Sequence, residues 1–261
     1  TILLLALIVG VLALWRNRLE IKILAPLMFI FLFMQALLGG LAVMFPTSAV
    51  ILAFHFGVSS LSVASVIVTM LFIFELGGWD KLRDRHISVG FRALIWGITI
   101  YTYVVIYLGA YVLHTNAALA CTSWPLCAPG RLLPPTIVEP VAINMTHRVA
   151  AGILALLVVW LFVWARRLRK ARPDIYLASI AALTLILLQV AEGAIVVLSL
   201  AHVWAEVMHS AFIALFFCVM VYMCLKSLPR PATARSADGT TPTTSKKAIR
   251  PSRTATTAVS R

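Results

Sequence analysis

The sequence predicts an all-α, polytopic membrane protein, and three observations support this fold class. Of the 261 residues, 62% are hydrophobic and only 12% are charged, and a soluble domain could not cover that much apolar surface with so few charges. The apolar residues form continuous runs of roughly the 20 residues that a bilayer-spanning helix needs. These runs do not alternate with polar residues, which excludes a transmembrane β-barrel.

Six apolar runs are long enough to span a bilayer. They cover about residues 23–45, 50–74, 93–113, 143–165, 175–200 and 204–226. A seventh run, 1–15, is too short to span comfortably. It has no positively charged region before it and does not resemble a signal peptide. We therefore expect it to be the second part of a helix that begins upstream.

The basic residues predict the orientation of these helices. Twenty of the 22 lysines and arginines fall in connections on one side of the membrane or in the C-terminal tail. The other side keeps Arg131, with Arg148 just inside a helix. Because positive charge marks the cytoplasmic face, we expect a cytoplasmic C-terminus. The net charge of +13 is then a topology signal, and nucleic-acid binding need not be invoked.

The composition divides the chain into four segments. We expect a group of helices over residues 1–74, a polar cytoplasmic linker over 75–92, and a bundle of four helices over 93–226. The tail 227–261 is rich in Pro, Ala, Thr, Ser and basic residues, so it cannot bury a core and is expected to be disordered.

An internal repeat relates the first and second helix groups. A glutamine is followed four residues later by glycine and twenty residues later by histidine in both groups, with a shift of 154 residues between the copies. The copies consist of Gln35, Gly39 and His55, and of Gln189, Gly193 and His209. Because the repeated helices run in the same sense, we expect the two halves to be related by an axis along the membrane normal.

Three histidines lie at similar depth within the predicted helices: His55, His147 and His209. A single membrane histidine could simply bond to a neighbouring helix, although ionisable groups in lipid are costly and favour function. Two imidazoles on two helices can bind one iron from opposite sides, and haem iron is the usual occupant. The shared depth of all three histidines favours the second interpretation.

The longest external loop contains Cys121 and Cys127, with five residues between them. On the outer side the compartment is oxidising, so a disulfide is the natural interpretation. Two free thiols or a metal pair are the alternatives, but the loop has no further Cys or His pair to complete a zinc site. Cys218 and Cys224 lie in the last predicted helix, and we expect them to be packing residues.

In these motifs the chain resembles the heme A synthases, over about residues 1–226. The segments that carry the resemblance are Phe33–Val43, Phe54–Gly57, Gly109–Thr115, Cys121–Cys127 and His147–Arg148. The resemblance implies a multi-pass enzyme of the cell membrane that oxidises a methyl group of heme O to a formyl group for cytochrome oxidase. It also implies a haem b cofactor, and heme O synthase and cytochrome oxidase assembly proteins as partners.

The resemblance also assigns roles to individual residues. His147 and His209 are the expected axial ligands of haem b, His55 an expected ligand of the substrate haem iron, and Cys121 and Cys127 the expected disulfide. Arg148, beside His147 at the outer boundary, is a candidate contact for a haem propionate, with a lipid headgroup as the alternative.

Several family features are absent from this sequence. We expect two pseudo-repeated four-helix half-bundles, with the first helix of the N-terminal half missing. The family's first cysteine pair and its Glu-x-x-His segment, whose glutamate is thought to be catalytic, are also missing. We expect roughly 60 further residues upstream of Thr1, enough for one helix and an outer loop, including a histidine and a carboxylate.

The chain also departs from the family at Leu113, where arginine is expected, and at Glu192. A carboxylate facing lipid is expensive, so we expect Glu192 to face the bundle interior. It would then either accept a hydrogen bond from a ligand imidazole or carry a neutral carboxyl bonded to a backbone carbonyl.

Three other functions fit parts of the pattern. A diheme b-type electron carrier without substrate chemistry would use the same histidines. A di-iron carboxylate enzyme is suggested by Glu206-x-x-His209, although such a site needs two such helices and further glutamates. A transporter or assembly factor built on repeats would need no haem.

Overall fold

The computed structural model describes residues 2–15, 19–74, 79–127 and 139–229, and all regular secondary structure among them is helical. The chain forms two units, Thr1–Pro229 and Arg230–Arg261. The second unit lies outside the described residues, as does nearly all of the tail that the sequence predicts to be disordered. The all-α fold class is therefore confirmed for the part of the chain that the structure describes.

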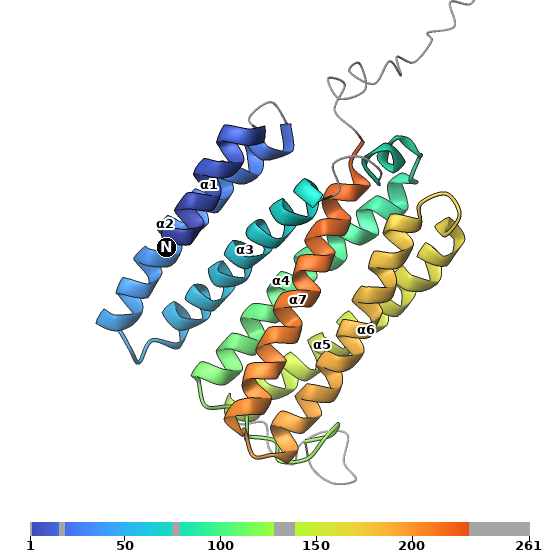
Figure 1. Ribbon diagram of the computed structural model, residues 1–261. Coiled ribbons are helices and arrows are strands. Elements are labelled where there is room, and N and C mark those ends of the chain that lie inside the picture. Colours follow the sequence, from blue (N-terminus) through green and yellow to red (C-terminus); the bar gives the residue numbers. More distant parts are fainter. Residues whose placement is uncertain (1, 16–18, 75–78, 128–138, 230–261) are drawn as a thin grey trace, which may run out of the picture. The chain divides into compact units, whose positions relative to one another are not determined.

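Seven α-helices follow one another along the described chain (Figure 1). They are α1 (Ile2–Trp15), α2 (Leu19–Met44), α3 (Ala49–Phe74), α4 (Val89–His114), α5 (Glu139–Ala165), α6 (Pro173–Leu198) and α7 (Val203–Ser227). Two short 3-10 helices, η1 (Trp79–Asp84) and η2 (Arg166–Leu168), lie in the connections. Six of the α-helices, α2 to α7, are long and apolar enough to cross a membrane, as the six apolar runs predict.

Helix α4 begins earlier than the apolar run predicts. The run begins near residue 93, whereas the helix begins at Val89. The side chain of Ser88 caps the helix by accepting a hydrogen bond of 3.3 Å from the backbone N–H of Phe91. A cap satisfies a backbone donor that the helix itself cannot pair, so the first turn forms outside the apolar stretch.

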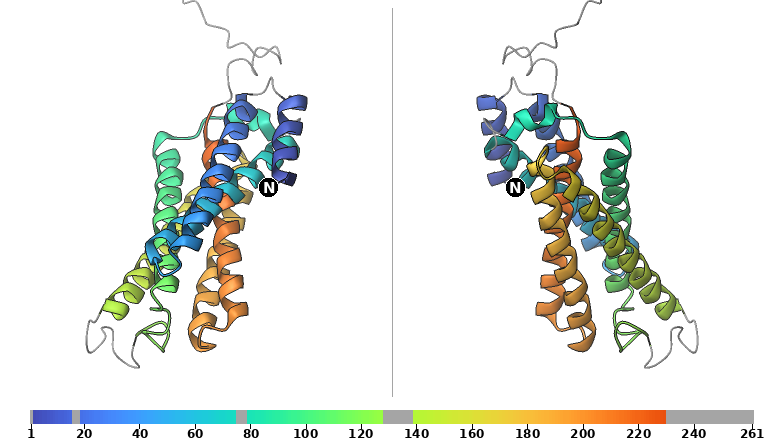
Figure 2. Two further views of the ribbon diagram at one scale, coloured as in Figure 1. Left: turned by 90° about the vertical axis from the view of Figure 1, so that its left-hand side faces the viewer. Right: turned by 90° about the vertical axis from the view of Figure 1, so that its right-hand side faces the viewer.

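The main hydrophobic core lies among α3, α4, α5, α6 and α7. It contains fully buried residues such as Phe91, Val158 and Met220. Cys218 and Cys224 belong to the same core as free thiols, which confirms their predicted packing role. A smaller cluster around Met28 joins α1 to α2. The α6–α7 pair and the α4–α5 pair diverge toward the end that carries the cysteine loop (Figure 2).

Three arginine side chains hold the C-terminal end of α7, the helix that carries His209. Arg172 is fully buried, forms an ion pair of 2.7 Å with Asp174 and donates to the carbonyl of Lys226. Arg92 donates to the carbonyl of Ser227, and Arg83 to that of Leu228. The last carbonyls of a helix have no partner within it, so these bonds anchor α7 at this end.

Candidate functional site

A cavity of about 330 Å³ lies among α4, α5, α6 and α7. A volume of this size lies within the range of small-molecule and cofactor sites. The structure brings His147 of α5 and His209 of α7 together in its lining, whereas His55 of α3 is outside this lining. The other lining residues that matter below are Gly109, Trp124, Pro125, Arg148, Gln189, Gly193, Glu206 and Ile213.

His147 enters the cavity against the backbone of α4. A Cβ atom added to Gly109 would lie 2.9 Å from Cε1 of His147 and 3.5 Å from each ring nitrogen. Real Cβ contacts are not this short, so the imidazole occupies space that exists only because residue 109 has no side chain.

His209 enters from α7 and contacts two residues of α6. The side-chain amide of Gln189 lies 3.0 Å from Nε2 of His209, within hydrogen-bond distance. A Cβ added to Gly193 would lie 3.3 Å from Cε1 of the same ring. The repeat motif therefore has a structural meaning in this half, because its glutamine and its glycine both touch its histidine.

His55 has a related but different environment on α3. A Cβ added to Gly39 of α2 would lie 3.5 Å from Cε1 of His55, which is an ordinary contact. The amide of Gln35, however, donates to the hydroxyl of Ser59. Within the described residues, Nδ1 of His55, His147 and His209 is buried without a hydrogen-bond partner. A buried polar atom of this kind calls for a ligand, a water or an ion.

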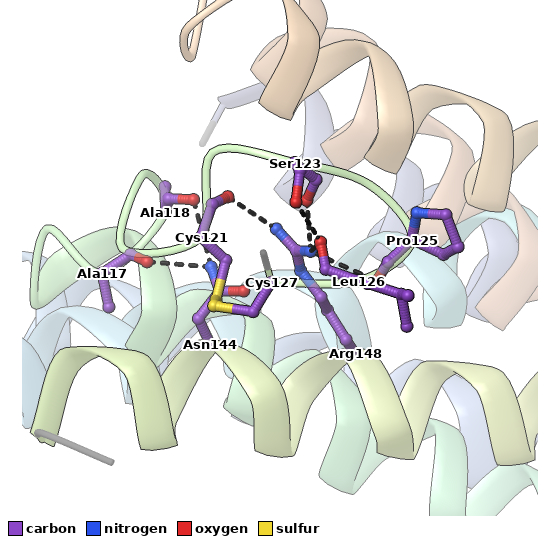
Figure 3. The surroundings of a disulfide bond; sticks show 9 residues. All are labelled: Ala117, Ala118, Cys121, Ser123, Pro125, Leu126, Cys127, Asn144 and Arg148. Carbon is purple, nitrogen blue, oxygen red and sulfur yellow. Dashed lines mark hydrogen bonds between the residues drawn. A yellow bond between two sulfur atoms is a disulfide. The ribbon is translucent and has the colours of Figure 1, made fainter. Parts of the chain in front are cut away.

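The cysteine loop covers one end of the cavity. Cys121 and Cys127 form a disulfide with a Cα–Cα distance of 4.5 Å, as the oxidising side predicts (Figure 3). Trp124 and Pro125, which lie between the cysteines, contribute to the cavity lining. Asn144 of α5 donates to the carbonyls at the start of this loop, with bonds of 2.8 and 3.0 Å to Ala117 and Ala118.

Arg148 fastens the same loop to α5. Its guanidinium donates to four backbone carbonyls of the loop (Figure 3). The acceptors are Cys121 at 2.8 Å, Ser123 at 2.7 Å, Pro125 at 3.3 Å and Leu126 at 3.4 Å. Arg148 also lines the cavity, so the propionate contact stays a prediction. The sequence did not reveal the loop contact, because the loop carries no partner side chain for the guanidinium.

The two glutamates of this region have different positions. Glu206 lies in the cavity lining, one turn before His209, whereas Glu192 is outside that lining and partly exposed on α6. One of the two alternatives for Glu192 was a hydrogen bond with a ligand imidazole. In the structure it is Gln189 that makes this contact, with His209. The described residues contain no group of three or more His, Cys, Asp or Glu that could hold a metal ion.

Comparison with known proteins points to one family. A family model described as cytochrome oxidase assembly protein matches residues 1–221. The heme A synthase of Geobacillus kaustophilus is 40% identical over 220 residues, which is 84% of this chain and 69% of the relative. That of Geobacillus thermodenitrificans is 41% identical over 85% and 71% of the two chains. That of Bacillus cereus strain ATCC 14579 is 36% identical over 86% and 71%.

Proposed function

This chain belongs to the family of cytochrome oxidase assembly proteins that includes the heme A synthases, and we propose that it is an oxidoreductase that converts heme O to heme A. The reaction oxidises a methyl group at the porphyrin edge to a formyl group. Such a methyl group is unreactive toward ordinary acid, base or nucleophilic side chains, so the reaction requires redox chemistry that a cofactor supplies.

The proposed cofactor is a haem b held by His147 and His209. The observation that carries this proposal is that two imidazoles from two helices line one cavity of about 330 Å³. The donor set fits, because paired imidazoles are common axial ligands of haem iron in membrane cytochromes. The mostly apolar helices around the cavity would enclose the flat ring, while Gly109 and Gly193 leave room for the imidazoles.

We propose His55 as a ligand of the substrate haem iron. His55 is related to His209 by the 154-residue repeat, and its Nδ1 is also buried without a partner in the described chain. Its neighbour Phe56 lines the cavity of His147 and His209. Helix α3 would therefore carry the substrate ligand next to a residue of the cofactor cavity, which brings the two haem sites close together.

The disulfide loop would exclude water from the outer end of the cofactor cavity. Trp124 and Pro125 cover the cavity, and Arg148 holds the loop through its backbone carbonyls. Exclusion of water lowers the local dielectric and strengthens the electrostatic interactions inside a site. Arg148 would additionally compensate the charge of a haem propionate at this boundary.

The charge distribution supports a single orientation in the cell membrane. We propose that the C-terminus and the basic connections are cytoplasmic and that the Cys121–Cys127 loop is extracytoplasmic. Heme O would come from a heme O synthase, and the product would pass to cytochrome oxidase assembly. Both haems are flat ligands with a largely apolar ring and two charged propionates, and such amphipathic molecules partition into the bilayer, which suits transfer between membrane proteins.

Extraction of the pigments from purified protein tests the proposal. Protein purified from cells that make heme O should contain haem B together with heme O or heme A. Its iron content should equal its total haem content. Haem B alone, even with heme O available, would instead favour the diheme electron carrier. Protein free of iron would contradict both and favour a transporter or an assembly factor.

A further inference from the structure

The same contact between an imidazole and a glycine occurs in three helix pairs. His147 of α5 faces Gly109 of α4, His209 of α7 faces Gly193 of α6, and His55 of α3 faces Gly39 of α2. In each case the nearest atom to an added Cβ would be Cε1 of the ring. The three contacts belong to different parts of the chain, and two of them line the cofactor cavity.

The contacts form a graded series. The distance from an added Cβ to Cε1 would be 2.9 Å at Gly109, 3.3 Å at Gly193 and 3.5 Å at Gly39. The first is too short for any real Cβ, the second requires a shift of a few tenths of an ångström, and the third is ordinary van der Waals contact. The imidazole of His147 therefore depends most on its glycine.

Glycines elsewhere in these helices do not make such contacts as a rule. A Cβ on Gly40 of α2, Gly97 of α4 or Gly152 of α5 would meet nothing within 4 Å. Gly57 of α3 and Gly90 of α4 are exceptions, because a Cβ on either would contact an aromatic ring, that of Tyr107 or Trp164. Glycine is unfavourable inside a helix relative to alanine, so its presence opposite each of the three rings needs a compensating reason.

We infer that Gly109 and Gly193 are positioning residues for the axial imidazoles of His147 and His209. Each glycine lets one ring lie directly against the backbone of the neighbouring helix. The terminal torsion of a histidine side chain is intrinsically broad, so packing must select the orientation of the ring. Close-packed interiors transmit even a one-methyl change, and the residues around a metal ligand tune its orientation and the metal's properties.

This inference rests on the proposed haem b site, and it makes a specific claim about that site. The two glycines would determine the depth at which each imidazole nitrogen meets the iron and the rotation of each ring about the iron–nitrogen bond. Both quantities affect the electronic state of a low-spin haem and its midpoint potential. A merely structural glycine would affect stability and leave these spectroscopic properties unchanged.

Three alanine variants of the full chain test the inference: Gly109→Ala, Gly193→Ala and, as a control on the same helix as Gly109, Gly97→Ala. The measurements are haem B content, the electron paramagnetic resonance spectrum of the ferric haem and its midpoint potential. We expect Gly109→Ala to lose haem B and to shift the spectrum of what remains. Gly193→Ala should retain haem B with a smaller shift in spectrum and potential, and Gly97→Ala should match the wild type.

The inference is overturned if Gly109→Ala and Gly193→Ala both keep the wild-type spectrum and potential. It is also overturned if Gly97→Ala causes the same changes, because the effect would then come from the helix and not from the ring. If Gly109→Ala does not fold, the milder contact at Gly193 decides the question. A wild-type protein without haem B would instead contradict the proposed cofactor site itself.

Discussion

The helix pairs α2–α3 and α6–α7 carry the same motif, but its glutamine has different partners in the two. In α6–α7, the amide of Gln189 forms a hydrogen bond with the ring of His209. In α2–α3, Gln35 donates to Ser59, and no hydrogen bond joins it to His55 in the described structure. The glycine contact is also tighter in the second pair, with an added Cβ 3.3 Å from the imidazole instead of 3.5 Å.

One position differs between the two copies in a way that fits the different glutamine partners. The residue that corresponds to Ser59 in the second copy, 154 positions later, is Ile213. Isoleucine offers no hydrogen-bond partner, whereas the hydroxyl of Ser59 accepts a hydrogen bond from Gln35. A repeated motif can therefore adopt two hydrogen-bonding patterns when the residue opposite it changes. It also suggests two different roles for the two histidines.

The largest expected difference between the two copies concerns haem b. His209→Ala or His147→Ala should abolish the low-spin haem b spectrum, because each removes one of the two proposed axial ligands. His55→Ala should leave that spectrum intact. Absorption spectra of the purified variants decide this. Retention of the spectrum in both His147→Ala and His209→Ala would refute the ligand assignment.

We expect the Cys121–Cys127 loop to affect haem retention only in the cavity of His147 and His209. Arg148→Ala removes hydrogen bonds from a charged donor to four carbonyls, each worth about 1.5–3 kcal/mol when buried and less where water replaces it. We expect faster loss of haem B on heating or on transfer to apomyoglobin. Arg166→Ala, at an exposed arginine, is the control. Equal retention in the two variants would show that the loop does not enclose the cofactor.

Substitutions of Gln189 and Gln35 should have unequal effects on the midpoint potential of haem b. Gln189→Leu removes the hydrogen bond between this amide and His209, which is worth about 1 kcal/mol. This corresponds to a shift of the one-electron midpoint potential on the order of 40 mV if the bond acts on one oxidation state only. Gln35→Leu should leave the haem b potential unchanged. Redox titration of both variants measures the difference. A similar shift in both would contradict the proposed separation of the two sites.

A substitution at Ile213 should change the hydrogen bonding of Gln189 toward that of Gln35. Ile213→Ser places a hydroxyl where Ser59 stands in the first copy, so Gln189 should turn from His209 to the new hydroxyl. We expect a midpoint shift in the same direction as that of Gln189→Leu, but smaller because the amide stays nearby. The double variant with Gln189→Leu should then show no additional shift. An additive result would mean that the introduced hydroxyl does not capture the glutamine.

The smallest effect is expected at Glu192, whose counterpart in the first copy is Leu38. Glu192 is partly exposed on α6 and lies outside the cavity lining. Glu192→Gln should therefore leave haem content and midpoint potential unchanged. A clear potential shift in this variant would restore the alternative in which the carboxylate supports a ligand imidazole.

Local periodicity and residue spacing are enough to predict several features of this protein. Continuous apolar runs of sufficient length predict α2 to α7, since each helix satisfies its own backbone in lipid. The shift of 154 residues predicts that α2–α3 and α6–α7 repeat one another. The cysteine spacing on the outer side predicts the Cys121–Cys127 disulfide, which the structure contains.

The contacts between side chains of different helices could not be predicted in this way. The sequence shows Gln35 and Gln189 as equivalent, yet one bonds to Ser59 and the other to His209. Arg172 belongs to a run of basic residues that predicts topology, but it is fully buried in an ion pair with Asp174. Hydropathy and spacing describe one helix at a time, whereas a hydrogen bond or a ring packed against glycine depends on the residue that the neighbouring helix places opposite.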